Sequence, residues 1–206
     1  MTSPDSLASP DRGDPLHHRL DYFVDMYGDD PDPWGFEREW YERRKYNLTL
    51  AALPRHRYRR ALEPGCANGA LTERLANRCD SVVAFDVIPE AAARACDRVA
   101  GLAHVDVDVG TFPTTWPPGT GDLVVWSEVA YYLTEPGRDA ARAGLDTWLE
   151  PGGHLVAVHY TGQTDYPMAG ADVAPWIDSF GWMRRLVTID DPDFALVVWE
   201  RPVPDG

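Results

Sequence analysis

Acidic residues and spaced glycines that follow short apolar runs are the parts of this 206-residue chain best suited to chemistry. Glu63 directly precedes a turn that contains Gly65 and Gly69, and Asp86 ends the apolar run 82–85. Glycine has no side chain and tolerates positive φ, so such a turn lets the backbone approach a ligand closely. The acid at its start disfavours a phosphate cradle and favours a ligand that offers hydroxyls or an ammonium group.

Further polar residues stand where other apolar runs end. Asp108 closes the run 104–109, Ser127 and Glu128 follow the run 122–126, and His159 closes the run 154–159. In open α/β sheets, ligands bind outside the carboxyl ends of the strands. Asp86 lies 23 residues after Glu63, close to the spacing of about 20 that places an acid on a ribose in nucleotide-binding units. We therefore expect these side chains to share one edge of a sheet.

The elements that must position these residues alternate along the chain. The pattern predicts strands at 59–63, 81–86, 104–109, 122–126 and 154–159, with helices at 71–78, 89–100, 138–149 and 173–180. Strands that alternate with helices imply right-handed crossovers and a parallel sheet covered on both faces. Two last β-like runs, 183–189 and 194–200, are joined by a short turn-rich link, which favours an antiparallel hairpin. The predicted fold class is α/β.

The N-terminal region differs in composition from the rest. Residues 1–20 are rich in Pro, Asp and Ser, which predicts a disordered tail. Residues 21–57 are expected to form a helical extension, with Asp32 and Pro33 as a helix start. Residues 58–202 then form the main domain.

Composition limits the partners. The net charge of −14 and pI of about 4.7 argue against nucleic acid and anionic membranes as partners. The stretch 37–60 is an exception, with eight basic against three acidic residues, which we interpret as a solvated helix face or a carboxylate contact. Cys66, Cys79 and Cys96 match neither a disulfide framework nor a zinc site, so we expect reduced thiols, no metal and a cytoplasmic location. No signal peptide or membrane span is evident.

The sequence resembles the class I S-adenosylmethionine-dependent methyltransferases. Four segments carry the resemblance: EPGCANG at 63–69, FDV at 85–87, DLVV at 122–125 and LEPGGHL at 149–155. It implies a Rossmann-like, seven-stranded, mostly parallel sheet with an antiparallel last strand. It also implies S-adenosylmethionine as the cofactor.

A more specific resemblance is to the nodulation protein S branch of these enzymes. It covers about residues 30 to 200 and rests on DPWGF at 32–36, WYERRKY at 40–46, RYRRALEPGC at 57–66 and SEVAYYL at 127–133. That branch includes N-methyltransferases that act on the free amine of a deacetylated amino sugar. The resemblance thus implies a small-molecule acceptor.

The resemblance also assigns cofactor contacts. The methionine end of the cofactor is expected to meet the loop residues Glu63, Gly65, Cys66 and Gly69, the ribose Asp86, and the adenine Val87. The adenine amine is expected to meet Asp108 and the backbone of Val109, although Gly110 also fits a slipped alignment. Ser127 is expected at the cofactor's centre, and Trp34, Tyr41 and either Arg44 or Lys45 in an N-terminal lid.

The acceptor side is read from residues after the fourth and fifth strands. Glu128 and His159 are candidates to accept a proton from the amine or to position its ammonium form. Tyr131 and Tyr132 are candidates to stack on a sugar ring, and Asp165 lies in a polar loop that is a further candidate. Structural interpretations stand beside these: Glu128 as a cap, His159 as a core histidine and the tyrosines as packing residues.

Three other functions are alternatives to N-methyl transfer. A nicotinamide dehydrogenase requires Gly-x-Gly-x-x-Gly, but Ala67 and Asn68 follow Cys66, so the glycine pattern fails. A non-catalytic cofactor-binding module would bind the donor without methylating anything. A small-molecule O-methyltransferase would share the fold and differ only in the acceptor atom, which fold analogy does not decide.

Overall fold

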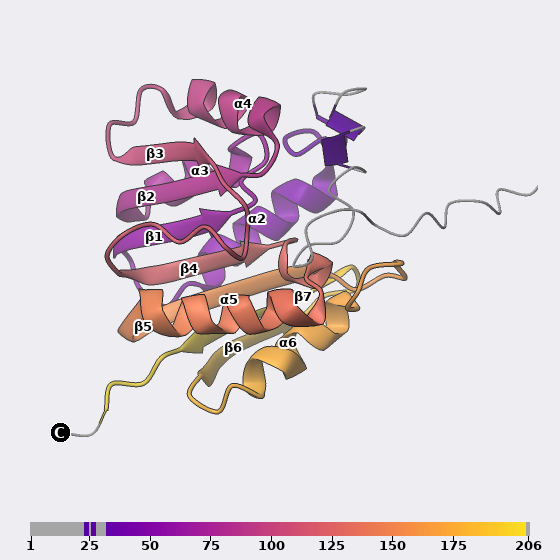
Figure 1. Ribbon diagram of the computed structural model, residues 1–206. Coiled ribbons are helices and arrows are strands. Elements are labelled where there is room, and N and C mark those ends of the chain that lie inside the picture. Colours follow the sequence, from indigo (N-terminus) through magenta and orange to yellow (C-terminus); the bar gives the residue numbers. More distant parts are fainter. Residues whose placement is uncertain (1–22, 25, 28–31, 205–206) are drawn as a thin grey trace, which may run out of the picture.

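A seven-stranded sheet forms the centre of the computed structural model, which describes residues 23–24, 26–27 and 32–204 (Figure 1). Its order is β3-β2-β1-β4-β5-β7-β6. The strands are β1 (Tyr58–Pro64), β2 (Cys79–Asp86), β3 (Val105–Val109), β4 (Gly121–Ser127), β5 (Leu149–Tyr160), β6 (Arg184–Asp190) and β7 (Phe194–Glu200). β7 pairs antiparallel with β5 and β6, and the other neighbouring pairs are parallel. The predicted Rossmann-like sheet with an antiparallel last strand is confirmed.

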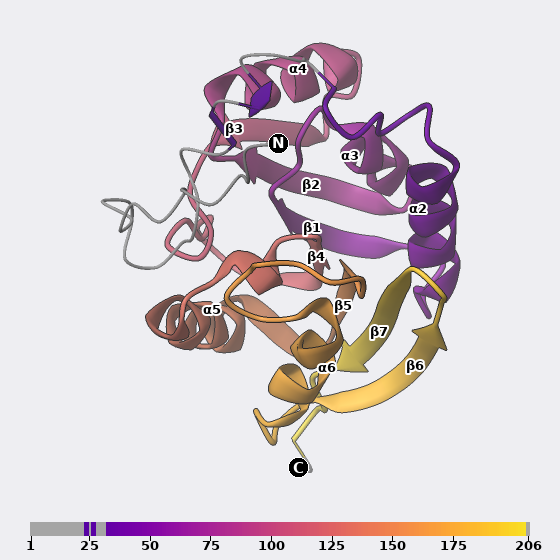
Figure 2. The same cartoon turned by 90° about the vertical axis from the view of Figure 1, so that its right-hand side faces the viewer.

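Helices cover both faces of the sheet (Figure 2). They are α2 (Trp40–Ala52), α3 (Ala70–Ala76), α4 (Pro89–Val99), α5 (Glu135–Trp148) and α6 (Gly170–Asp178), with a short 3₁₀ turn η1 (Ala130–Tyr132). Tyr46 of α2 and Leu75 of α3 belong to the apolar core on one face. Leu145 of α5 and Ile177 of α6 belong to the core on the other face. The helices cover the two faces, and Glu63, Asp86 and Ser127 line a cavity at the carboxyl ends of the strands.

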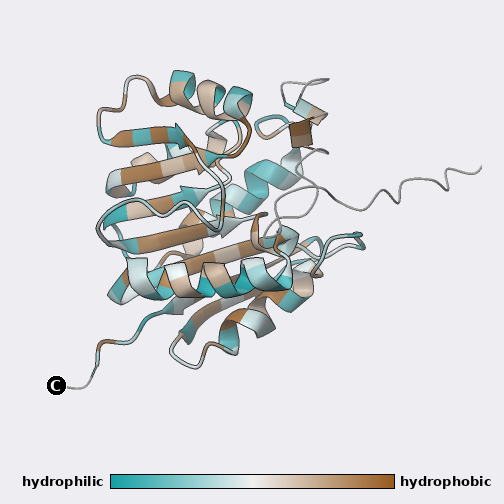
Figure 3. Cartoon of the chain, in the orientation of Figure 1, coloured by the Kyte–Doolittle hydropathy of each residue, from teal (hydrophilic) through white to brown (hydrophobic). Residues whose placement is uncertain are grey.

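The strands are apolar along most of their length, whereas α2 is largely polar (Figure 3). Val124, Val125 and Trp126 of β4 are fully buried, as expected for a parallel strand covered on both faces. Helix α2 nevertheless buries Glu42 and Lys45. Charged side chains are almost never fully buried without a partner, so this helix calls for a specific explanation.

The N-terminal extension differs from its predicted form. The helix expected from Asp32 begins instead at Trp40, because Gly35 adopts φ +63 and interrupts a helical path. Asp32 Oδ1 accepts a hydrogen bond from the Phe36 amide at 2.9 Å, which closes a turn at this point. The tail predicted for 1–20 lies outside the described residues, and the boundaries at 21–57 and 58–202 stay predictions.

Candidate functional site

A cavity of about 470 Å³ opens at the carboxyl ends of β1, β2 and β4. The strand ends place Glu63, Asp86 and Ser127 around it, and α2 contributes a side that includes Tyr41 and Lys45. Aromatic side chains line much of the rest: Phe23, Tyr27, Trp34, Phe36, Phe112, Tyr131, Tyr132, Tyr160 and Tyr166. The site therefore combines an acidic edge with apolar walls.

The glycine loop after β1 is shaped by packing and by Asp86. Gly65 has φ +69, and a Cβ built on it would lie 2.4 Å from Val129 Cγ1, so only glycine fits. Asp86 Oδ2 accepts from the Ala67 amide at 2.8 Å and Oδ1 from the Ile88 amide at 2.9 Å. Burial raises the pKa of Asp86, and these two amides oppose the rise. Each oxygen keeps acceptor capacity for a further donor.

Glu63 is buried at the end of β1 and lines the cavity. Burial, with a smaller contribution from Asp86, raises its pKa to about 8. Within the described residues, Oε2 meets no donor in hydrogen-bonding geometry, although the Thr72 hydroxyl lies near the carboxyl group. A buried carboxylate without a partner is costly, so a cationic ligand group beside Glu63 would stabilise its charged form.

Glu128 lies just after β4 and is the most heavily hydrogen-bonded side chain of the site. Oε1 accepts from the Tyr41 hydroxyl at 2.7 Å and from Lys45 Nζ at 2.9 Å. Oε2 accepts from the Tyr131 hydroxyl at 2.7 Å and from the Tyr160 amide at 2.9 Å. Burial alone would raise its pKa, but Lys45, the electrostatic effect of His159 and the hydrogen bonds from Tyr131 and Tyr160 hold it at about 2. Glu128 is thus an ionised carboxylate whose two oxygens each accept two hydrogen bonds.

Lys45 joins α2 to this carboxylate. Its side chain is 1% exposed, and its ammonium contacts Glu42 Oε1 and Glu128 Oε1, each at 2.9 Å. Burial raises the pKa of Glu42, and Lys45 opposes the rise. The two acids around Lys45 therefore differ in their pKa shifts, because Glu128 has four hydrogen-bond donors, whereas Glu42 has Lys45 and, with a smaller contribution, Tyr46. Lys45 explains how the polar helix α2 docks on the sheet.

Ten of the predicted site residues lie together around the cavity: Trp34, Glu63, Gly65, Cys66, Asp86, Val87, Ser127, Glu128, Tyr131 and Tyr132. Six others do not line it: Arg44, Gly69, Asp108, Val109, His159 and Asp165. Their surroundings give the physical reasons.

Two of these six have structural partners instead. The His159 side chain is buried, and its Nε2 accepts a hydrogen bond from the Ala130 amide at 3.0 Å. Burial lowers its pKa to about 4, so it is a neutral core histidine rather than a group at the cavity. Arg44 pairs with Asp191 at the β6–β7 turn and lies over the Phe194 ring. Lys45, the alternative to Arg44, is the one that lines the cavity.

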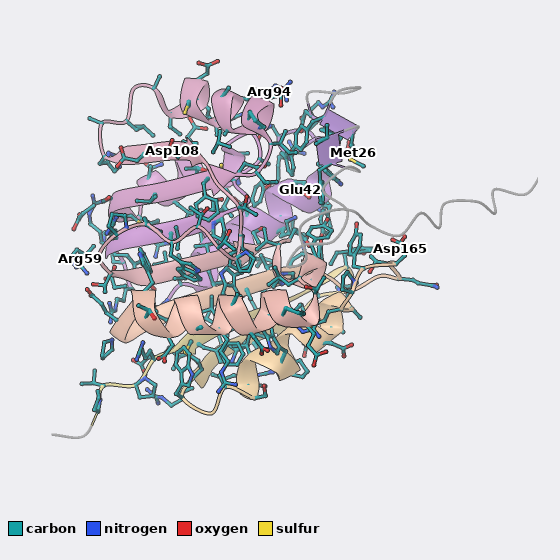
Figure 4. All side chains as sticks on the ribbon, viewed as in Figure 1. Met26, Glu42, Arg59, Arg94, Asp108 and Asp165 are labelled. Carbon is teal, nitrogen blue, oxygen red and sulfur yellow. The ribbon has the colours of Figure 1, made fainter. Side chains whose placement is uncertain are left out.

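The residues predicted to contact the adenine amine lie in different places. Asp108, labelled in Figure 4, and Val109 are exposed on β3, while Gly110, the alternative from the slipped alignment, lines the cavity. Asp165 is exposed on the loop between β5 and α6 and does not line the cavity. Gly69 starts α3 with φ +78, and a Cβ there would lie 3.0 Å from Ala95 Cα, so it serves helix packing.

Sequence reasoning missed several residues that line the cavity: Phe23, Tyr27, Phe36, Glu42, Phe112 and Tyr160. Most are aromatic, and a signal for some of them existed. The density of aromatic residues in 22–46 exceeds what one amphipathic helix needs for packing. Phe112 follows β3 in a loop whose path toward the cavity has no local sequence signature.

The described residues offer neither a metal site nor a membrane-spanning helix. Among residues 23–24, 26–27 and 32–204, no group of three or more His, Cys, Asp or Glu side chains is placed to hold a metal ion. In the same residues, no helix has the length and apolar character needed to cross a membrane.

Comparison with known proteins identifies the family. The family model of nodulation protein S matches residues 23–156. The chain belongs to the NodS family. It is 37% identical over 127 residues to nodulation protein S of Rhizobium tropici, which covers 61% of this chain and 53% of that protein. It is 35% identical over 130 residues to the protein of Sinorhizobium fredii, covering 61% of this chain and 59% of that one. The chain thus spans between half and three fifths of these curated NodS relatives.

Solved structures extend the similarity over more of the chain. A protein from Pseudomonas syringae is 40% identical with a TM-score of 0.71, covering 79% of this chain and 100% of the other. The N-methyltransferase NodS from Bradyrhizobium japonicum WM9, in complex with S-adenosyl-L-homocysteine, is 26% identical with a TM-score of 0.78. That match covers 89% of this chain and 98% of the other. The predicted NodS-like resemblance is confirmed at the level of family and fold.

Proposed function

We propose that the protein transfers a methyl group from S-adenosylmethionine to the amine of a small acceptor such as an amino sugar. The observation that carries the proposal is the cavity at the ends of β1, β2 and β4, which gathers Glu63, Asp86 and Glu128 in a chain of the NodS family. The NodS N-methyltransferase similar to this chain was solved with S-adenosyl-L-homocysteine. From that enzyme we take S-adenosylmethionine as the methyl donor and nitrogen as the acceptor atom.

The residues of the cavity fit such a donor. Its volume of about 470 Å³ falls within the range of about 300–1,000 Å³ usual for small-molecule sites. Asp86 keeps acceptor capacity for two ribose hydroxyls, and the carboxyl group of Glu63 suits an ammonium group. Val87, Gly110 and Phe112 offer an apolar place for adenine. Gly65, Cys66, Ser127 and Trp34 are the remaining proposed cofactor contacts.

S-adenosylmethionine, when bound, supplies a methyl group on a positively charged sulfur, so the methyl group is already activated. The amine nitrogen forms the new C–N bond with its lone pair, the C–S bond breaks with its electron pair left on sulfur, and the product ammonium later loses a proton to solvent. The task of the protein is to hold the amine in line with the methyl group. Orientation of this kind contributes up to about 7–11 kcal/mol to catalysis.

The ionisation state of the site favours an amine over an alcohol. An alcohol needs a base to remove its proton during the attack, whereas a neutral amine has a free lone pair. Glu128, with a pKa of about 2, is a weak base, and His159 does not line the cavity. Glu128 is therefore proposed to position groups rather than to take the proton.

The aromatic walls favour a sugar-sized acceptor. The Tyr132 and Tyr166 rings are 4.6 Å apart in an edge arrangement, and the Tyr131 ring lies 4.8 Å from that of Tyr166. Rings of this kind combine a large apolar face with a polar tip, which matches a pyranose ring and its hydroxyls. We propose that Tyr131 and Tyr132 contact the acceptor. Asp165, exposed on the loop after β5, is left out of the proposed contact set.

Transfer of a labelled methyl group tests the proposal. The protein is incubated with methyl-labelled S-adenosylmethionine and, separately, with glucosamine, N-acetylglucosamine and catechol. We expect label in glucosamine but not in the other two, because acetylation removes the nucleophilic amine. Label in catechol alone would indicate an O-methyltransferase. Thermal stabilisation by S-adenosylhomocysteine without transfer to any acceptor would indicate a cofactor-binding module, and stabilisation by NADH alone would contradict the donor.

A further inference from the structure

The hydrogen bonds around Glu128 fix the direction of two hydroxyl protons. An ionised carboxylate accepts hydrogen bonds and cannot donate them. The Tyr41 and Tyr131 hydroxyls, each 2.7 Å from a different oxygen of Glu128, must therefore donate their protons to it. The ammonium group of Lys45 also donates a hydrogen bond to Glu128. The donor orientation of both tyrosines follows from the ionisation of a single side chain.

Each hydroxyl oxygen then presents lone pairs away from Glu128. Both tyrosines line the cavity, Tyr41 from α2 and Tyr131 from η1. Burial and then the charge of Glu128 raise the pKa of both, so they stay neutral phenols. The Tyr132 hydroxyl lies near that of Tyr131, which leaves acceptor capacity on the latter because a phenol oxygen has two lone pairs.

We propose that the Tyr41 and Tyr131 oxygens accept the two N–H groups of a neutral primary amine, with Glu128 as the positioning residue that orients both hydroxyls. This rests on the proposed N-methylation and names the residues that would select the acceptor. A primary amine has two N–H groups and one lone pair. With both N–H groups bound to oxygens, the lone pair is the one part of the nitrogen left for the methyl group.

The same arrangement would select among acceptors by the number of N–H or O–H groups that each can donate to the two tyrosine oxygens. A hydroxyl acceptor has one O–H and a secondary amine one N–H, so each can satisfy only one of the two tyrosines. An ammonium ion has no lone pair and cannot attack. The site thus fits the neutral primary amine, and a methylated product fits less well than its substrate.

The backbone at Glu128 and the placement of α2 support the proposal. Glu128 has φ +56, an uncommon conformation for a residue other than glycine, and such outliers cluster at functional sites. The two tyrosines come from separate elements and meet only through this residue. The pair of acceptors therefore exists only while α2 is docked on the end of β4, a contact that Lys45 also makes.

Replacing each tyrosine by phenylalanine tests the inference, because the ring stays and the acceptor oxygen goes. The variants are Tyr41→Phe, Tyr131→Phe and Glu128→Gln, assayed with glucosamine and with N-methylglucosamine. We expect kcat/KM for glucosamine to fall about tenfold in each phenylalanine variant, because each loses one hydrogen bond to the amine. In Glu128→Gln we expect a fall as well, because the amide no longer fixes the direction of both hydroxyls. We also expect the preference for the primary over the secondary amine to fall toward one, which a general loss of stability would not produce. Binding of S-adenosylhomocysteine should stay within about twofold of the wild type.

Tyr58→Phe is the matched control. Tyr58 is buried like Tyr131, and its hydroxyl is hydrogen-bonded to His154 Nδ1 at 2.7 Å, but Tyr58 does not line the cavity. It should lower the melting temperature and leave kcat/KM unchanged. If the buried Tyr131→Phe fails to fold, Tyr41→Phe on α2 decides the matter. A wild type that methylates glucosamine, together with folded Tyr41→Phe that keeps both kcat/KM and the amine preference, overturns the inference alone. A wild type inactive on every amine overturns the proposed function, and the inference with it.

Discussion

At the residue scale, the charged cluster of Lys45, Glu42 and Glu128 decides how the acceptor side of the cavity is built. Glu128 was predicted from its place after an apolar run, and the structure places it at the cavity. Its pKa of about 2 could not be predicted from the sequence, because two of its donors come from a helix more than 80 positions earlier. The same long-range packing separates Lys45, which lines the cavity, from Arg44, which does not.

The Lys45→Met substitution tests how much the cluster of Lys45, Glu42 and Glu128 contributes to the free energy of unfolding. The substitution keeps the length of the side chain but leaves the buried Glu42 and the partly buried Glu128 without the cation that they share. Removing one partner of a buried ion pair costs about 3–5 kcal/mol, and we expect the free energy of unfolding in urea to fall by that amount. The exposed neighbour Arg43→Met should change it by less than about 0.5 kcal/mol. Equal effects of the two substitutions would show that the cluster contributes little.

Glu63 gives the protein a pH dependence with a definite sign. Its pKa is about 8 in the folded state and near 4.5 when unfolded, so the folded state binds the proton more tightly. The stability that this proton provides is complete below about pH 4.5 and is lost as the pH rises to about 8. We expect Glu63→Gln to reduce the fall in unfolding free energy between pH 5 and 8, measured in urea. Glu90→Gln, at an exposed position on α4, should leave the fall unchanged, and the same fall in Glu63→Gln would contradict the assignment.

At the element scale, the loop between β1 and α3 is fixed by its contact with the segment after β4. The motif predicted a close approach of the backbone to a ligand, and the structure adds that Val129 approaches Gly65. The strands were predictable because their apolar runs are local signals. The start of α2 was not, because a positive φ at Gly35 and the side-chain bond of Asp32 compete with helical propensity there.

Gly65→Ala separates backbone strain from steric overlap. Positive φ alone costs about 1–2 kcal/mol for alanine, and the overlap with Val129 adds to it. Gly181, with φ +76 and open space around its Cβ position, is the matched control and should show only the backbone cost. In a Val129→Ala background, the cost of Gly65→Ala in urea unfolding should fall to that of Gly181→Ala. An unchanged cost in that background would contradict the overlap.

At the scale of the whole molecule, the fold and the family can be predicted from local sequence patterns, whereas the partners of the charged residues cannot. The excess of basic residues in 37–60 looked like a solvated face or a ligand contact. In the structure several of these arginines pair with acids from other elements: Arg55 with Asp122, Arg57 with Asp80, and Arg59 with Glu150. Because those acids lie on the strands β4, β2 and β5, their pairing depends on the order of the strands in the sheet and cannot be predicted from the sequence.

The position of the new methyl group on an acceptor that carries both an amine and hydroxyls tests the proposed function most directly. Glucosamine is such an acceptor, and its product with ¹³C-methyl S-adenosylmethionine can be analysed by carbon–proton NMR correlation. The site, with an ionised Glu128 and a buried His159 away from the cavity, predicts the methyl carbon on nitrogen. A methyl carbon found only on oxygen would contradict N-methylation, and so would the same yield from N-acetylglucosamine.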